Sequence, residues 1–129
     1  MRKKFLFGLL SITLLTVLLS ACRIIDASAI PQNPKVRMGS NNFIDSTATV
    51  KKGQSLDLVD TVASQHVIVN GTWDGAVQKP GKEPGAPDIG TVNFTGSDTK
   101  SIGPFNTAGT FKFYCNIHPG MNLQVTVTS

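Results

Sequence analysis

Two strand patterns near the C-terminus, joined by a very short segment, constrain this chain more than any other feature. Residues 110–115 and 123–128 carry β-branched and aromatic side chains at every second position, the pattern of half-buried strands. The segment between them, from Cys115 to Met121, is therefore fixed at both ends. Period two places Cys115 on the face of Phe111 and Phe113, and Met121 on the face of the apolar residues that follow it. If both are core faces, a thiol and a thioether point inward at the same end of a sheet.

The segment Cys115-Asn-Ile-His-Pro-Gly-Met121 concentrates three potential metal ligands in a Cys-x-x-His-x-x-Met spacing. The chain has two histidines, and the one outside this segment, His66, opens an apolar strand pattern. Two imidazoles, a thiolate and a weak axial thioether are the ligand set of a trigonal blue-copper site. We therefore predict one copper ion bound by His66, Cys115, His118 and Met121. Taken singly, each of these four residues could have a purely structural role. A lone buried cysteine, for example, usually packs as a small apolar residue.

The remaining strand patterns are short and closely spaced, and no stretch after the N-terminal region has a helical apolar period. About seven or eight strands in one domain predict an all-β fold, either an antiparallel sandwich of two sheets or a Greek-key barrel. The expected strands are 35–38, 47–50, 55–60, 65–70, 89–94, 100–102, 110–115 and 123–128. Asn70-Gly71 is expected to end the fourth.

The segment 74–88 is polar and contains three prolines. We expect a solvated surface loop there, although a loop of this length can also bind a partner.

The N-terminus has the pattern of an export signal. Arg2, Lys3 and Lys4 precede an apolar run over 5–19, which is shorter than the ~20 residues of a membrane span. The run ends in Leu-Ser-Ala-Cys22, which resembles the lipobox of bacterial lipoproteins, where the cysteine is acylated.

We therefore expect a lipoprotein signal helix over 1–21, a lipidated tether over 22–34 and one domain over 35–129. An ordinary secretory signal and an uncleaved anchor are the alternatives. All three place the domain outside the cytoplasm, at the outer face of the cytoplasmic membrane if Cys22 is acylated.

The charge of the chain argues against a nucleic-acid partner. Without the three cations of the signal, nine of the 12 basic residues remain against eight acidic ones, a net charge of about +1. A near-neutral domain without a basic run has no electrostatic footprint for nucleic acid.

Residues 35–129 resemble a cupredoxin of the plastocyanin and amicyanin type. The matching motifs are the Lys52-Gly53 turn, the His66-Val-Ile-Val strand, Gly-Thr-Phe-x-Phe-Tyr-Cys over 109–115 and Cys-x-x-His-x-x-Met. The resemblance implies a Greek-key β-sandwich that carries one copper ion between redox proteins. It makes His66, Cys115 and His118 the strong ligands, Met121 the weak axial one, and His118 the electron port.

Three residues beside the ligands, Val67, Asn116 and Ile117, are expected to shape the site. Plastocyanin has an asparagine that links its ligand loops where this chain has Val67, so that link is in question. The family has proline before the second histidine, whereas Ile117 keeps a backbone N–H. We expect this N–H to bond the Cys115 sulfur and favour the reduced state, so that Ile117→Pro lowers the reduction potential.

These features favour an electron carrier that works with extracytoplasmic redox proteins, such as a cytochrome or an oxidase, as a monomer. An enzyme is not expected, because four protein ligands leave no open metal position and no histidine remains to act as a base. A copper storage or delivery protein is the alternative, and a metal-free β-sandwich interaction module is a third.

Overall fold

The computed structural model describes residues 31–129, which form nine strands. The predicted signal over 1–21 and most of the tether over 22–34 lie outside the described residues, as does Cys22. The strands are β1 Lys35–Met38, β2 Thr47–Lys51, β3 Leu56–Asp60, β4 His66–Asp74, β5 Val77–Pro80, β6 Val92–Phe94, β7 Thr99–Ile102, β8 Gly109–Cys115 and β9 Asn122–Thr128. Within this part of the chain, no helix is long and apolar enough to span a membrane.

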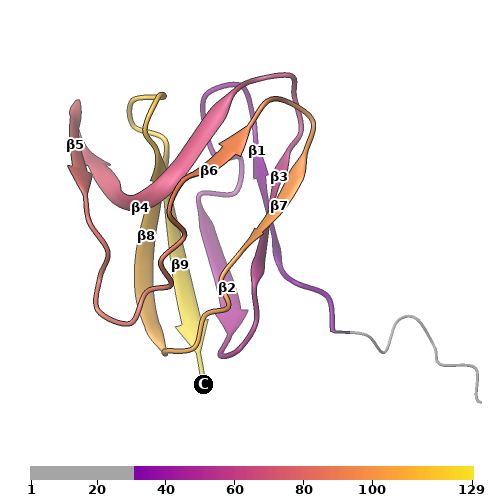
Figure 1. Cartoon of the computed structure of the whole chain (residues 1–129), viewed down its shortest axis with the longest axis vertical. Coiled ribbons are helices and arrows are strands. Elements are labelled where there is room, and N and C mark those ends of the chain that lie inside the picture. The colour runs from indigo at the N-terminus through magenta and orange to yellow at the C-terminus, as the bar shows by residue number, and fades with distance from the viewer. Residues whose placement is uncertain (1–30) are drawn as a thin grey trace, which may run out of the picture. The chain divides into compact units, whose positions relative to one another are not determined.

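The strands form two facing sheets, so the prediction of an all-β sandwich is confirmed (Figure 1). One sheet has three strands in the order β1-β3-β7. The other has six, in the order β2-β9-β8-β4-β5 with β6 paired to β4. The chain passes from one sheet to the other between β1 and β2, and returns between β2 and β3.

The expectation of a purely antiparallel sandwich is wrong in two places. β1 pairs with β3, and β2 with β9, in parallel. Parallel neighbours need a crossover connection, and here the chain visits the opposite sheet between them. Alternation of apolar and polar residues indicates which face of a strand is buried but not the direction in which the strand runs. The sequence pattern therefore does not distinguish parallel from antiparallel pairing.

The fourth strand is longer than predicted, and its extension forms a hairpin that the sequence did not indicate. β4 continues through Gly71, and β5 returns beside it over part of the segment predicted to be a loop. Gly71 has φ of 124°, and a Cβ there would lie 2.4 Å from the carbonyl oxygen of Lys79. Only glycine fits this close approach. β5 escaped detection because all its side chains are exposed and show no alternation.

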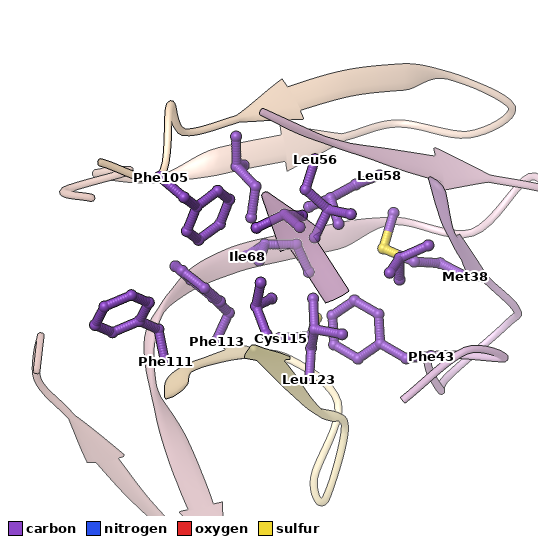
Figure 2. Close-up of a cluster of buried hydrophobic side chains, with 14 of the residues drawn as sticks. Met38, Phe43, Leu56, Leu58, Ile68, Phe105, Phe111, Phe113, Cys115 and Leu123 are labelled. Atoms are coloured by element: carbon purple, nitrogen blue, oxygen red, sulfur yellow. The ribbon is translucent and has the colours of Figure 1, made fainter. Parts of the chain in front are cut away.

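The core lies between the inner faces of the two sheets (Figure 2). β8 and β9 supply alternate apolar side chains to it, as predicted, and Cys115 and Met121 are buried among them. Phe105 enters from the loop before β8 and packs edge-on against Phe113, with ring centroids 5.9 Å apart. Among the described residues, the buried polar side chains are Asp60 and His66. Both lie on inward-facing positions.

The chain joins the sandwich slightly before the predicted domain start. The Asn33 side chain donates a hydrogen bond to Asp57 at 2.9 Å, and the Pro34 carbonyl accepts one from the Asp57 N–H. Residues from Gln32 to Ser129 form one compact unit.

We predict that Gly71→Ala destabilises the protein more than Gly75→Ala does. Both glycines have positive φ, which costs a non-glycine residue about 1–3 kcal/mol. A Cβ at Gly71 also meets backbone within 3 Å, whereas one at Gly75 meets nothing within 4 Å. The additional overpacking costs about 1–3 kcal/mol. Urea unfolding of both variants measures the difference, and equal free energies of unfolding would contradict the close approach of β5.

Candidate metal centre

Three of the four predicted ligands converge at one end of the sandwich. His66 opens β4, Cys115 ends β8, and His118 lies in the segment between β8 and β9. One donor atom from each lies within 4.8 Å of the others. His66 and Cys115 are fully buried, and His118 is partly buried. The Cys115 sulfur lies 3.5 Å from His118 Nδ1, and the two imidazole rings meet edge to face with centroids 5.0 Å apart.

Backbone hydrogen bonds of Val67 hold the two distant parts of the site together. The Val67 N–H donates to the Cys115 sulfur at 3.4 Å, across 48 positions of sequence. The Val67 carbonyl accepts from the Asn116 N–H at 2.9 Å. These bonds continue the antiparallel pairing of β4 with β8 beyond Ile68 and Cys115. The link between the ligand segments therefore exists here without an asparagine side chain, because the main chain at Val67 supplies it.

The expected hydrogen bond from Ile117 requires correction. Among the described residues, the N–H that bonds the Cys115 sulfur belongs to Val67, and none is formed by Ile117. The Ile117 side chain is 44% exposed. The basis for expecting a lower potential in Ile117→Pro is thereby removed, since the proline would delete no bond to sulfur.

Main-chain hydrogen bonds within the ligand segment join its two ends, Cys115 and Met121. The Cys115 N–H donates to the Met121 carbonyl at 3.0 Å, and the Met121 N–H donates to the His118 carbonyl at 3.2 Å. Gly120, with φ of 76°, makes the turn that these bonds require. Met121 is 2% exposed and lies on the inward face of the chain as it enters β9, which places its thioether among the buried side chains.

His66 has the environment expected of a metal ligand. Both ring nitrogens are buried, and neither has a hydrogen-bond partner. Nε2 faces Asp60, at 3.8 Å from Oδ1, so Nδ1 is the nitrogen left for a metal ion. Burial lowers the pKa of His66, opposed by Asp60 and the Gly39 backbone and reinforced by His118. A neutral imidazole keeps the lone pair that coordination needs, and two imidazoles with a thiolate suit copper.

The β4–β5 hairpin donates hydrogen bonds to carbonyl groups of the ligand segment, residues 115–121. The Trp73 indole N–H donates to the Cys115 carbonyl at 2.8 Å, and the Gln78 amide donates to the Asn116 carbonyl at 2.9 Å. The Tyr114 hydroxyl donates to Gln78 Oε1 at 3.2 Å and orients that amide. The Trp73 and Tyr114 rings pack edge to face with centroids 5.9 Å apart.

The same hairpin also holds the far end of the segment. The Asn122 side chain accepts from the Trp73 N–H at 2.7 Å and donates to the Trp73 carbonyl at 3.1 Å. This amide thereby replaces the main-chain partner that a neighbouring strand would supply. The ligand segment is bounded on both sides by bonds to one strand.

Sequence reasoning missed Asp60, Trp73, Gln78 and Asn122. A signal existed for Asp60 alone, since period two in β3 puts it on the face of Leu56 and Leu58. The other three act through tertiary contacts of a hairpin that the polar composition concealed.

Comparisons with known proteins support the fold. No protein-family model and no curated protein matches the sequence. Solved amicyanin structures match: that of Paracoccus versutus with a TM-score of 0.55 and 22% identity, over 81% of this chain and 90% of that one. A copper(I) amicyanin variant (TM-score 0.53, 17% identity) and a reduced variant (0.54, 18%) match over the same shares. The chain thus has an amicyanin-like cupredoxin fold, as the sequence resemblance implied.

We predict that Trp73→Phe loosens the ligand segment. The phenyl ring keeps the packing on Tyr114 but leaves the Cys115 carbonyl without its donor, which costs about 1–3 kcal/mol. Amide hydrogen exchange over 115–122 of the metal-free protein should accelerate. Lys79→Ala is the matched control on the same hairpin, because its ammonium pairs with exposed Asp74. Equal rates of amide hydrogen exchange in the two variants would contradict the proposed stabilisation of the ligand segment by the Trp73 indole N–H.

Proposed function

We propose that this protein is a single-electron carrier that uses one copper ion bound by His66, Cys115, His118 and Met121. One observation carries the proposal: three donor atoms already lie within 4.8 Å of one another, one of them from a buried imidazole whose Nδ1 has no partner. Burying such polar groups is costly unless something satisfies them. The Met121 thioether, buried at the same end of the core, is the fourth ligand.

The chain supplies a set of ligands of which three, His66, Cys115 and Met121, are buried. Copper would contribute the exchange of one electron between its two common oxidation states. Because the ligand positions are held by main-chain bonds of Val67 and by the β4–β5 hairpin, little rearrangement accompanies that exchange. The Val67 N–H withdraws charge from the thiolate, which favours the reduced state.

The two imidazoles differ in exposure, which indicates the side of the site from which electrons reach the metal ion. His66 is fully buried, whereas His118 is partly exposed beside exposed Ile117. Electrons therefore enter and leave through His118, and the neighbouring apolar surface of Ile117, Pro119 and Gly120 contacts a redox protein. Four protein ligands leave no position for a substrate, which argues for a carrier rather than an enzyme.

The N-terminal sequence pattern supports a location outside the cytoplasm. We infer that residues 1–21 direct export, that Cys22 is acylated, and that 22–34 tethers a monomeric domain to the membrane. The near-neutral charge of the exported chain argues against nucleic acid as a partner. A cytochrome, an oxidase or another electron-transfer complex at the membrane is the expected partner.

We predict that the protein with Cu(II) has an intense visible absorption band from thiolate-to-copper charge transfer. Reductant should bleach the band, and Cys115→Ser should abolish it. Cys22→Ser is the control, because it removes the other cysteine and should keep the band while releasing the protein from the membrane fraction. A pale complex, or one whose colour survives Cys115→Ser, would contradict the ligand assignment.

The same copper protein separates electron transfer from storage or delivery, which would use the same ligands. For a carrier, voltammetry should show a reversible one-electron wave, and a Cu(I) chelator should remove the ion slowly. Irreversible voltammetry together with rapid loss to the chelator would favour storage or delivery.

A further inference from the structure

A buried carboxylate lies behind the proposed metal ligand His66. β3 directs Leu56, Leu58 and Asp60 into the core in turn, so Asp60 occupies a position that an apolar residue would be expected to fill. Its side chain has no exposed surface. It projects from the three-stranded sheet toward His66, which comes from the facing sheet.

The surroundings of Asp60 leave it only one side-chain partner. Its Oδ1 accepts the Val62 N–H at 3.2 Å and lies 3.8 Å from His66 Nε2, while Oδ2 has no hydrogen-bond partner. Among the described residues, no lysine or arginine forms an ion pair with it. A buried carboxylate in an apolar core costs several kcal/mol unless it is compensated. The nearest side chain that such a carboxylate can act on is the imidazole of His66.

We propose that Asp60 is a positioning residue for the metal centre, a role that rests on the proposed function. Through its charge, 3.8 Å from Nε2, it favours the His66 proton on that nitrogen and leaves the Nδ1 lone pair for the metal ion. Its negative charge, transmitted through the imidazole, favours the more highly charged Cu(II). Carboxylates behind ligating histidines fix the tautomer and ring orientation and raise ligand basicity.

The charge distinguishes Asp60 from the other groups around His66. The Gly39 backbone also acts on the ring but is neutral, and His118 is itself a proposed ligand. Asp98 and Lys100 pair with each other near the protein surface. Neutralising Asp60 is therefore the change that removes a charge from behind the ligand while keeping the shape of the core.

The first test compares Asp60→Asn with Asp57→Asn. The asparagine has the shape of the aspartate but no charge, so the ratio of Cu(I) to Cu(II) affinity should rise about tenfold, because outer partners of ligands are worth about 10–100-fold. For a one-electron couple this raises the reduction potential by about 59 mV. Asp57 is the matched control on the same strand, bonded instead to Asn33 and Ser101, and its variant should leave the potential unchanged. Equal potentials in the two variants would overturn the proposal.

The second test needs neither copper nor a variant. In the metal-free protein, ¹⁵N NMR of the histidine rings should show neutral His66 with its proton on Nε2. A proton on Nδ1 would overturn the proposed role of Asp60. Because this readout is independent of copper, it separates the two proposals: a wild-type protein that fails to bind copper defeats the electron carrier, whereas a His66 proton on Nδ1 defeats the role of Asp60.

Discussion

The main chain at Val67 is the element on which the metal centre depends. Its N–H bonds the Cys115 sulfur and its carbonyl accepts the Asn116 N–H, so one residue joins the start of β4 to the end of β8. His66, the preceding residue, is thereby fixed beside Cys115. Without this pairing the two ligands belong to distant parts of the sequence, and bringing them together costs chain entropy that no local contact offsets.

The sandwich makes that pairing rigid. Apolar side chains from both sheets surround Cys115 in the core, and close-packed interiors resist displacement of any one member (Figure 2). Outside the core, Trp73 and Gln78 of the β4–β5 hairpin donate hydrogen bonds to the carbonyls of Cys115 and Asn116. The ligand segment is therefore held from the core side by packing and from the hairpin side by hydrogen bonds.

Much of this arrangement could be predicted from the sequence, and the rest depends on tertiary contacts. The strands that supply the core were predicted because their apolar residues alternate with polar ones. Three metal ligands, Cys115, His118 and Met121, were predicted because they are close in sequence. His66 followed as the remaining histidine. The parallel strand pairs were missed because the alternation of apolar and polar residues does not depend on the direction of a strand. β5 was missed because an exposed polar strand shows no such alternation. The donor to the Cys115 sulfur was assigned to Ile117 rather than Val67, because sequence proximity carries no information about which N–H faces the sulfur.

We infer that the folded chain holds its ligands in place before a metal ion arrives. Crystal structures of the metal-free and copper-loaded protein test it most directly. We predict copper bound by His66 Nδ1, Cys115, His118 and Met121, with the main-chain bonds of Val67 unchanged between the two structures. Copper bound elsewhere, or a metal-free form in which His66 lies away from Cys115, would contradict the claim.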